Sequence, residues 1–314
     1  MTILVTADFT ASEWAAWWPA LQAALPGETL VRASELESAA ARAAVEVALV
    51  ANPPAGALAQ LPNLALIQSL WAGVDRLLAD PSVPAEVPFA RLVDPSMNRT
   101  MAQTALWAVL SLHRGFFDYA LQQQRGEWRQ LEQRRADEVD VAVLGLGEMG
   151  RTTALALAGH GYCVSGWSTH GVVIEGVQCA AGPAALNALL GRAEVVVNLL
   201  PLTPATRGVF NRARFAAMRE GASLVNFGRG AHVVEADLLA ALNGGRLRRA
   251  LLDVFEAEPL DPAHPFWRHP CITLLPHVAA LTDPRSAARV VAHNLQALRE
   301  RRPLGYLVDR ARGY

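Results

Sequence analysis

The chain has 314 residues, of which 52% are hydrophobic and 18% are charged, a composition that excludes a disordered or fibrous protein. Its formal net charge of -1 gives no electrostatic reason to expect nucleic acid as a partner. All 28 basic residues are arginines, which excludes mechanisms that need a lysine, such as Schiff-base formation. The length is typical of one large domain or of two domains of ordinary size.

The sequence carries no targeting, membrane or disulfide signal. Its first residues lack the basic segment of a signal peptide. The longest charge-free run, Val47–Val74, is interrupted by prolines and a glycine, so we expect no membrane span. Cys163, Cys179 and Cys271 have no spacing typical of a disulfide framework or a zinc site. These features predict a cytoplasmic protein without a bound metal.

The first third of the chain alternates strand patterns with helix patterns. Strands are predicted at Ile3–Thr6, Glu46–Val50 and Leu64–Leu70. Between the first two, large apolar residues recur at helical spacing and predict one buried helix face. These residues are Trp14, Trp17, Trp18, Leu21 and Leu25. Strands that alternate with helices favour a parallel, doubly wound sheet.

A long helical pattern covers Thr100–Gln124, and its stretch Ala105–Leu112 is apolar nearly all round. Such a helix is expected to be buried on most sides, where it could connect two domains or seal a subunit interface. The charged segment Gly126–Asp140 is predicted to be solvated. A second strand-and-helix series follows, and its later strand candidates are Cys163–Trp167, Val195–Leu199, Leu224–Phe227, Ala250–Val254 and Ile272–Leu275.

A glycine-rich turn opens this second series. Gly145, Gly147 and Gly150 form a GxGxxG pattern, with Glu148 and Met149 inside it, directly after an apolar strand and before a small-residue helix. In that context the first glycine permits a tight turn, the second lets the backbone approach a pyrophosphate, and the third allows close helix-strand packing. The pattern therefore predicts a nicotinamide dinucleotide site.

The residues that usually choose between NAD and NADP are missing. About 20 residues beyond the glycines an acid would bind the NAD ribose, or an arginine the NADP phosphate. The stretch Ser165–Gly171 has neither, and Ser168, Thr169 and His170 are the polar groups at its end. The prediction is therefore NAD(P)H, with the preference left open.

An arginine, a glutamate and a histidine each follow a predicted strand. Arg229 lies in NFGRG, Glu258 in DVFEAEP and His277 in LLPH. Because the carboxyl ends of parallel strands line the ligand crevice, we expect the three side chains to converge. An arginine can bind a carboxylate in a bidentate pair, and a histidine held by a carboxylate can donate a proton. This set suits the reduction of a 2-oxo acid.

The chain resembles the D-isomer-specific 2-hydroxyacid dehydrogenases, in particular their glyoxylate/hydroxypyruvate reductase A branch. The residues that carry the resemblance are GASLVNFGRGAHVVEADLLAALNGG, LLDVFEAEPLDPAHPFWRHPCITLLPHVAALT and the ending VDRARGY. The resemblance implies that Arg229 binds substrate, that Glu258 and His277 form the acid–base pair, and that Asp253 lies near the nicotinamide. It also implies a homodimer with the active site in a cleft.

The same resemblance implies a split fold. A flavodoxin-like substrate domain would comprise residues 1-100 and 284-314, and a Rossmann-type NAD(P)-binding domain residues 101-283. In the loop Leu70–Asp75 the N–H groups of Ala72 and Gly73 would hold the substrate carboxylate, with Trp71 beside them. The cofactor would also contact Trp167, Leu200, Pro201, Phe227, Gly228, Asp253, His277 and Ala279.

We therefore expect an NAD(P)H-dependent reductase that converts a small 2-oxo acid to the D-2-hydroxy acid, with His277 as proton donor. Ala51 stands where the branch tends to have an aromatic residue, which would open the pocket wall. Trp71 stands where the branch usually has a small residue, and its ring could shrink the pocket or cap a larger substrate. A related dehydrogenase for a larger substrate is therefore an alternative. A second alternative is a corepressor-type protein that senses the dinucleotide without catalysis.

Overall fold

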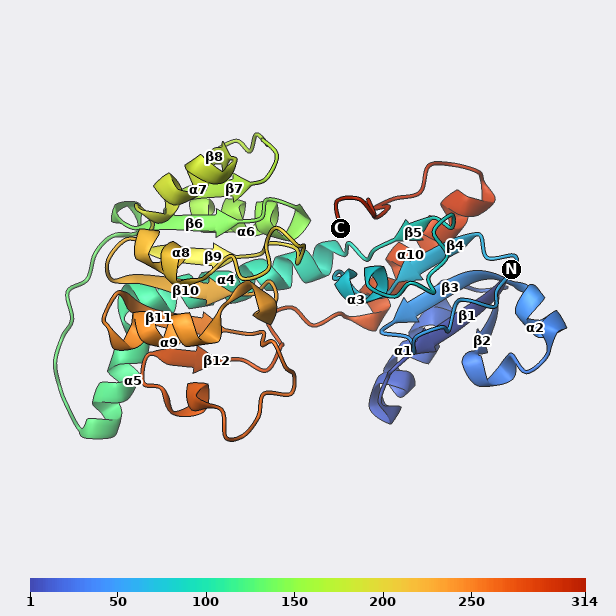
Figure 1. Cartoon of the computed structure of the whole chain (residues 1–314), viewed down its shortest axis with the longest axis horizontal. Helices are drawn as coiled ribbons and strands as arrows, with labels where there is room; N and C mark the ends of the chain where they lie inside the picture. Colours follow the sequence, from blue (N-terminus) through green and yellow to red (C-terminus); the bar gives the residue numbers. More distant parts are fainter. The chain divides into compact units, whose positions relative to one another are not determined.

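The computed structural model describes residues 1–314, which divide into two compact units. One unit contains Met1–Ser96 and Thr282–Tyr314, and the other contains Met97–Leu281. Each unit is built on one sheet of parallel strands with helices packed against it (Figure 1). The expected α/β class with two parallel sheets is therefore confirmed.

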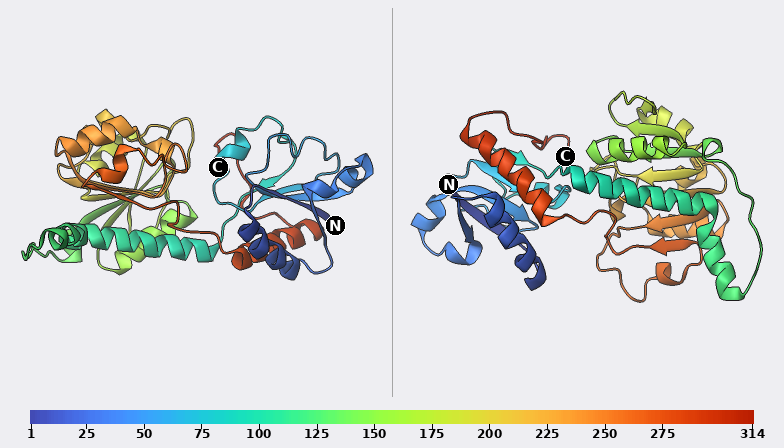
Figure 2. Two further views of the ribbon diagram at one scale, coloured as in Figure 1. Left: turned by 90° about the horizontal axis from the view of Figure 1, so that it is seen from below. Right: turned by 180° about the vertical axis from the view of Figure 1, so that it is seen from behind.

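The first unit has a five-stranded sheet in the order β2-β1-β3-β4-β5. Its strands are β1 (Thr2–Ala7), β2 (Thr29–Arg32), β3 (Val45–Ala51), β4 (Leu66–Ser69) and β5 (Phe89–Ala90). Its helices are α1 (Ala11–Ala24), α2 (Ala39–Ala43), α3 (Asp75–Leu78) and α10 (Pro284–Arg299), with the 3-10 turn η1 (Ala33–Glu35). Helices α1 and α10 pack side by side although they come from opposite ends of the chain (Figure 2).

Helix α1 only partly follows its predicted burial. It begins at Thr10, which forms a capping box with Glu13, and it buries Trp17 and Leu21. The rings of Trp14 and Trp18 instead lie at the edge of the core, where the Arg32 guanidinium stands 4.6 and 4.7 Å from their centroids. The core prediction is therefore wrong for these two tryptophans, which hold a surface arginine.

The second unit has a seven-stranded sheet in the order β12-β11-β10-β9-β6-β7-β8. Its strands are β6 (Asp140–Leu144), β7 (Cys163–Ser168), β8 (Gln178–Ala181), β9 (Val195–Asn198), β10 (Ala222–Asn226), β11 (Leu247–Leu252) and β12 (Ile272–Leu274). Successive strand residues point to opposite faces. Val141 and Val143 therefore join one core cluster, and Ala142 and Leu144 join the other.

Helices cover both faces of this sheet. Helices α4 (Pro95–Arg114) and α6 (Glu148–Gly159) contribute to one core cluster, whereas α7 (Pro183–Leu190), α8 (Arg212–Ala217) and α9 (Glu235–Asn243) contribute to the other (Figure 2). The remaining elements are α5 (Phe116–Arg125) and the 3-10 turns η2 (Ala136–Glu138), η3 (Gly230–His232) and η4 (Pro265–Arg268). No helix of the chain combines the length and apolarity needed to cross a membrane.

The predicted long helix is broken. Gly115 has a left-handed φ of 71° and separates α4 from α5, so the continuous pattern over Thr100–Gln124 is wrong at this glycine. A side chain at position 115 would also meet Leu131 at 2.8 Å. The expected burial on most sides holds for much of Ala105–Leu112, since Ala105, Ala108, Val109, Ser111 and Leu112 are buried, whereas Trp107 and Leu110 are 41% and 38% exposed.

Candidate functional site

The predicted residues of the second unit follow the carboxyl ends of its strands, which share one edge of a parallel sheet. Gly145 follows β6, Leu200 follows β9, Arg229 follows β10, Asp253 follows β11 and His277 follows β12. These strands are neighbours in the sheet. The order of the strands therefore brings together residues that are far apart in the sequence.

Arg229 lies directly before η3, in a loop that touches the loop of Glu258. A Cβ atom added to the adjacent Gly230 would lie 1.8 Å from the carbonyl carbon of Phe255, so the two backbones are in direct contact and only glycine fits there. The Nη1 atom of Arg229 donates a hydrogen bond to the Gly228 carbonyl at 2.8 Å. This contact keeps the guanidinium close to its own loop.

Glu258 and His277 form the hydrogen-bonded pair that the sequence predicts. Oε2 of Glu258 lies 2.7 Å from Nδ1 of His277, while Oε1 accepts the Phe255 N–H at 2.8 Å. The carboxylate is therefore held at both oxygens. With Nδ1 engaged, the Nε2 atom of the ring is left to meet a ligand, and the His277 side chain is 54% exposed.

The electrostatics of this pair favour a protonated imidazole. The hydrogen bond to Glu258 raises the pKa of His277 above its ordinary value, against the opposing effect of burial. Burial alone would raise the pKa of Glu258, but the hydrogen bonds from His277 and from the Phe255 N–H outweigh it and lower that pKa. A carboxylate and a charged imidazole are thus the preferred states, which is what a proton donor requires.

Asp253 is buried and shapes the loop that carries His277. Its carboxylate accepts the N–H groups of Val278 at 2.7 Å and of Ala279 at 3.1 Å, and its carbonyl accepts the His277 N–H at 2.8 Å. Burial raises the pKa of Asp253, and the two N–H donors offset that rise only in part. The carboxylate thus holds the backbone directly after His277, and the carbonyl of the same residue holds the N–H of His277 itself.

The glycine-rich turn has the geometry of a phosphate loop. Gly145 has a φ of 92°, and a Cβ atom on Gly150 would lie 1.7 Å from the Gly145 carbonyl oxygen, so both positions require glycine. Gly147 has no atom within 4 Å of the corresponding point and leaves an open space before α6. Glu148 and Met149 start that helix with N–H groups that lack helical partners. A pyrophosphate fits this open helix end.

The end of β7 offers polar side chains but no aspartate, glutamate or arginine. Trp167 is buried, and its indole N–H donates to the Gly182 carbonyl at 2.9 Å. The Ser168 hydroxyl donates to the carbonyl of His170, which folds the segment through Thr169 into a tight turn. The structure thus places Ser168, Thr169 and His170 together at the strand end.

The other predicted cofactor residues are mostly apolar and buried. Leu200, Phe227 and Ala279 are each less than a tenth exposed, and Pro201 follows Leu200 in the loop after β9. A Cβ atom on Gly228 would lie 2.9 Å from side-chain nitrogens of two buried residues. These positions shape the loops at the carboxyl edge.

The predicted carboxylate-binding loop belongs to the first unit, after β4. The ring of Trp71 packs against Phe9 and Trp17, with centroid distances of 5.8 and 5.7 Å, so the ring lies in an aromatic cluster of its own unit. The backbone N–H of Trp71 donates to the Ser69 hydroxyl at 3.0 Å. The N–H groups of Ala72 and Gly73 donate no hydrogen bond to the protein, as a ligand-binding loop requires.

The sequence analysis does not identify three residues at the carboxyl edge of the sheet in the second unit. Asn198, Asn226 and His232 are fully buried polar residues, and Asn226 and His232 bond the backbone of Arg229. The one signal in the sequence is their position at or just beyond strand ends. No group of three or more His, Cys, Asp or Glu side chains is arranged to hold a metal ion.

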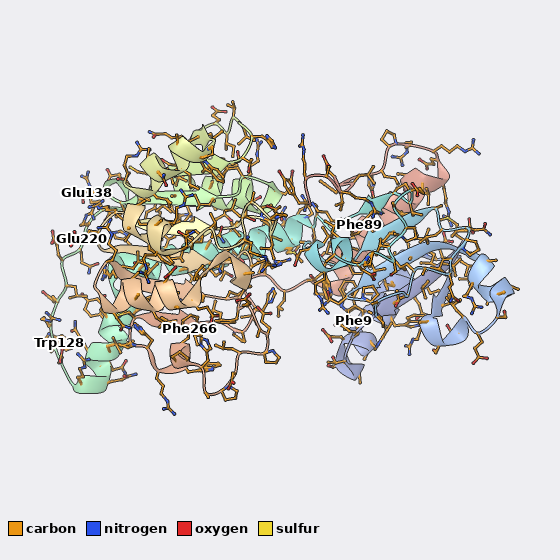
Figure 3. All side chains as sticks on the ribbon, in the orientation of Figure 1. Phe9, Phe89, Trp128, Glu138, Glu220 and Phe266 are labelled. Carbon is orange, nitrogen blue, oxygen red and sulfur yellow. The ribbon has the colours of Figure 1, made fainter.

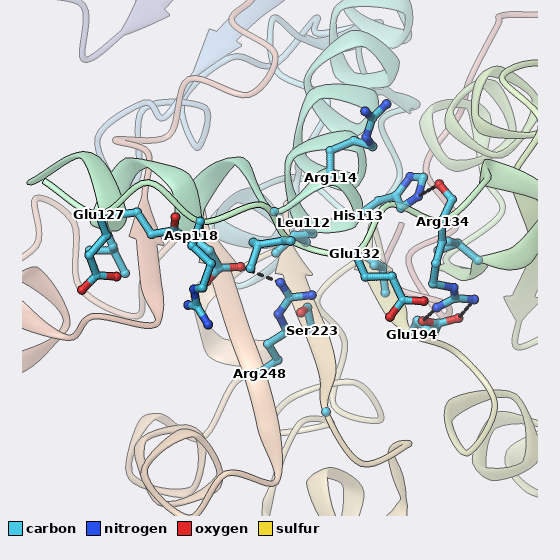
Figure 4. A pocket seen from close by; sticks show the side chains of 18 of the residues that line it. Leu112, His113, Arg114, Asp118, Glu127, Glu132, Arg134, Glu194, Ser223 and Arg248 are labelled. Atoms are coloured by element: carbon cyan, nitrogen blue, oxygen red, sulfur yellow. Dashed lines mark hydrogen bonds and ion pairs between the residues drawn. The ribbon is translucent and has the colours of Figure 1, made fainter. Parts of the chain in front are cut away.

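A cavity of about 540 Å³ lies elsewhere, at the amino ends of the strands of the second unit (Figure 4). Ion pairs line it: Arg248 with Asp118, and Arg134 with Glu194 at 2.6 Å. It contains none of the predicted site residues. The cavity is therefore separate from the candidate active site.

Residues 106–279 match the family model for the NAD binding domain of D-isomer specific 2-hydroxyacid dehydrogenases. A glyoxylate/hydroxypyruvate reductase A from Serratia proteamaculans is 42% identical over 274 residues, which cover 86% of this chain and 88% of that protein.

Two crystal structures are similar over the whole chain. A D-isomer specific 2-hydroxyacid dehydrogenase from Xanthobacter autotrophicus in complex with NADPH and MES has a TM-score of 0.93 and 39% identity, covering 100% of this chain and 99% of that one. An NADPH-dependent glyoxylate/hydroxypyruvate reductase from Sinorhizobium meliloti in complex with NADP and sulfate has a TM-score of 0.92 and 36% identity, with the same coverage.

Proposed function

This chain belongs to the D-isomer specific 2-hydroxyacid dehydrogenase family, and we propose that it reduces glyoxylate, hydroxypyruvate or a similar small 2-oxo acid with NAD(P)H. The product is the D-2-hydroxy acid where a stereocentre forms. The observation that carries the proposal is the Glu258–His277 hydrogen bond of 2.7 Å, which lies at the same sheet edge as Arg229 and the glycine-rich turn. A corepressor-type sensor would need no such acid–base pair.

Each residue of the site has a distinct role in this reaction. The hydride that adds to carbon 2 of the oxo acid is supplied by the nicotinamide dinucleotide when it is bound. Arg229 binds the substrate carboxylate and polarises the adjacent carbonyl. His277 donates the proton from Nε2 to the carbonyl oxygen, and Glu258 at Nδ1 keeps the ring protonated and oriented. Asp253 fixes the backbone that carries His277.

The dinucleotide is proposed to bind along the carboxyl edge of the second unit. The turn from Gly145 to Gly150 holds the pyrophosphate at the start of α6. Trp167, Ser168, Thr169 and His170 lie where the adenosine ribose is expected, while Leu200, Pro201, Phe227, Gly228 and Ala279 complete the contact surface.

The cofactor preference is expected to be weak. Residues 168–176 contain no arginine, so a 2′-phosphate gains no bidentate ion pair from this segment. They contain no acid next to Ser168 that would repel it either. We therefore propose that both NADH and NADPH support turnover.

We propose that the loop after β4 in the first unit is a carboxylate-binding loop. Ala72 and Gly73 offer the two N–H groups, and the aromatic packing of Trp71 against Phe9 and Trp17 keeps its ring in one place. A fixed ring next to these donors limits the size of the group that the substrate can carry there.

We also propose that the protein is a cytoplasmic homodimer. Large apolar side chains are exposed on α4, on α5 and on the following segment: Trp107 by 41%, Phe116 by 49% and Trp128, which is labelled in Figure 3, by 97%. Such a group of exposed aromatic residues is typical of a subunit interface, and a second copy would cover it. The three cysteines are unpaired, which agrees with a reducing compartment.

The oligomeric state is tested by sedimentation of the wild-type chain and of Trp128→Ser. The wild type should sediment as a dimer over the micromolar range. The variant should already dissociate into monomers at concentrations at which the wild type is still a dimer. Leu155→Ser, which removes an exposed apolar side chain on α6, is the control. A monomeric wild-type protein would contradict the proposal.

Activity is tested by following the oxidation of NADPH and of NADH at 340 nm with glyoxylate, hydroxypyruvate and larger 2-oxo acids. Both nucleotides should be oxidised with the small acids, and hydroxypyruvate should give D-glycerate on chiral chromatography. Dinucleotide binding without oxidation of any substrate in the panel would refute the reductase and favour a sensing role.

A further inference from the structure

His232 is a fully buried residue with hydrogen-bond partners in two loops of the candidate site. Its Nδ1 atom accepts the Arg229 N–H at 3.1 Å and an amide hydrogen of Asn198 at 2.9 Å. Because Nδ1 accepts from two donors, it carries no hydrogen, and the ring proton is on Nε2. Nε2 lies 3.3 Å from the Pro201 carbonyl oxygen, to which it can donate.

Two asparagines complete the connection. Asn198 donates to Oδ1 of Asn226 at 2.8 Å, and its own Oδ1 accepts the Leu200 N–H at 3.3 Å. Asn226 in turn donates to the Arg229 carbonyl oxygen at 3.0 Å. The backbone of Arg229 is therefore held at its N–H by His232 and at its carbonyl by Asn226.

Gly228 makes room for this network. A Cβ atom at that position would lie 2.9 Å from Nδ1 of His232 and 2.9 Å from Nδ2 of Asn198. Both are side-chain nitrogens with hydrogen-bond partners of their own, so they cannot move aside without breaking those bonds. The glycine of the NFGRG segment is thus explained by the buried polar groups beneath it.

We propose that His232 is a positioning residue for Arg229, and that through Pro201 it links the loop after β9 to the loop that binds the substrate carboxylate. This inference rests on the proposed function, since it takes Arg229 as the carboxylate ligand. Buried polar groups that are fully paired fix a single arrangement, whereas the loss of one partner leaves a costly unpaired donor. The network therefore sets the direction in which the Arg229 side chain leaves its loop.

The two ring nitrogens can be tested separately. A glutamine side chain places its amide where Nε2 lies, so His232→Gln keeps the hydrogen bond to the Pro201 carbonyl and loses the one from the Arg229 N–H. An asparagine side chain places its amide where Nδ1 lies, so His232→Asn keeps the hydrogen bond from the Arg229 N–H and loses the one to Pro201. His232→Gln should raise KM for glyoxylate by about 10-fold, as expected for one buried donor left unpaired. His232→Asn should leave KM within about 3-fold of wild type.

Three measurements distinguish positioning from a general structural role. Calorimetric titration with oxalate, a carboxylate ligand that is not reduced, should show the same loss of affinity in His232→Gln without any turnover. In an Arg229→Lys background, His232→Gln should change KM by less than about 2-fold, because the residue through which it acts is already altered. The matched control is His264→Gln, since Nδ1 of His264 also accepts a backbone N–H, that of Phe266 at 3.3 Å; it should leave KM unchanged.

The outcomes separate the inference from the proposed function. If wild-type protein reduces glyoxylate but His232→Gln folds with unchanged KM and oxalate affinity, or if its effect persists in the Arg229→Lys background, the positioning role is wrong. If wild-type protein neither reduces a 2-oxo acid nor binds oxalate, the proposed function itself fails. Should His232→Gln not fold, Asn226→Ala removes the donor to the Arg229 carbonyl instead and should raise KM in the same way.

Discussion

The carbonyl oxygen of Asp253 accepts the N–H of His277 at 2.8 Å, while the Asp253 carboxylate accepts the N–H groups of the next two residues. His277 has a left-handed φ of 56°, a conformation that costs free energy for a residue other than glycine. The buried carboxylate therefore stabilises a strained backbone at the proposed proton donor. The positions of Asp253 and His277 are coupled, although Asp253 does not contact the imidazole ring through a hydrogen bond.

Asp253→Asn should lower both stability and activity. The amide nitrogen of the new side chain brings its hydrogens toward the Ala279 N–H, which then keeps only the contact of 3.2 Å to the remaining oxygen. Such a weakened and opposed buried donor should cost about 1–3 kcal/mol in the free energy of unfolding. Urea denaturation measures that loss, and kcat should fall because the His277 loop moves. The control is Asp283→Asn, whose side chain also accepts a backbone N–H, that of Arg285 at 2.8 Å, but at an exposed helix cap where asparagine serves equally well. Equal stability of the two variants would show that Asp253 does not support the loop.

His277→Asn should retain dinucleotide binding and lose turnover. Asparagine tolerates a left-handed backbone better than alanine does, so the loop is expected to keep its conformation. Without the imidazole the proton donor is missing, and kcat should fall about 10²–10⁴-fold. Stopped-flow oxidation of NADPH gives kcat, and quenching of tryptophan fluorescence gives the dinucleotide affinity. His264→Asn breaks another histidine–carboxylate pair of the same unit, that with Glu235 at 3.1 Å, and should leave kcat unchanged. Normal turnover in His277→Asn would remove this residue from the mechanism.

Glu258→Gln should shift the pH dependence of reduction toward acid. With His277 as the proposed proton donor, reduction needs its protonated form, so kcat/KM is expected to fall as the pH rises through the pKa of this imidazole. Glu258 raises that pKa through its hydrogen bond, and the neutral glutamine does not. The decline in kcat/KM should therefore begin at a lower pH in the variant, while the difference narrows in acid, where both imidazoles are charged.

The control for this profile is Glu256→Gln. Glu256 is an exposed carboxylate near Glu258 in the chain that pairs with Arg207 at 3.9 Å and does not touch His277. Its variant should follow the wild-type curve. If Glu258→Gln also follows that curve, Glu258 does not set the ionisation of His277.

Sequence patterns predict the ionisable residues of this site better than they predict the buried polar residues that hold them in place. Arg229, Glu258 and His277 are recognisable because each is an ionisable residue after an apolar strand, and parallel strands end at one sheet edge. Asn198 and His232 cannot be recognised in this way. Their role depends on hydrogen bonds between residues 34 positions apart in the chain, and no local pattern encodes such a pairing.

The fold, too, has features that sequence patterns predict and features that they do not. The two parallel sheets follow from alternating strand and helix patterns, but the break at Gly115 does not. A single glycine is compatible with a continuing helix, and only its left-handed backbone and the approach of Leu131 separate α4 from α5. Likewise, β5 has only two residues, Phe89 and Ala90, and is too short for any periodicity to predict. The boundaries of the two domains and the roles of individual site residues stay predictions.

Two glycines of the phosphate loop, Gly150 and Gly147, should respond differently to the same added methyl group. Gly150→Ala forces a Cβ atom to within 1.7 Å of the Gly145 carbonyl oxygen, so α6 must move away from β6 and the midpoint of thermal unfolding should drop by several degrees.

Gly147→Ala adds its methyl group where no protein atom lies within 4 Å, and the fold should be unaffected. The same methyl group occupies the space in which a pyrophosphate approaches the start of α6. Fluorescence titration should therefore show weaker binding of NADPH and of NADH, by about the same factor for each, because the lost contact is to phosphates that both share. Gly159→Ala, which also meets no atom within 4 Å but lies at the other end of the helix, should bind both dinucleotides normally. Unchanged dinucleotide affinity in Gly147→Ala would mean that the pyrophosphate does not bind at this turn.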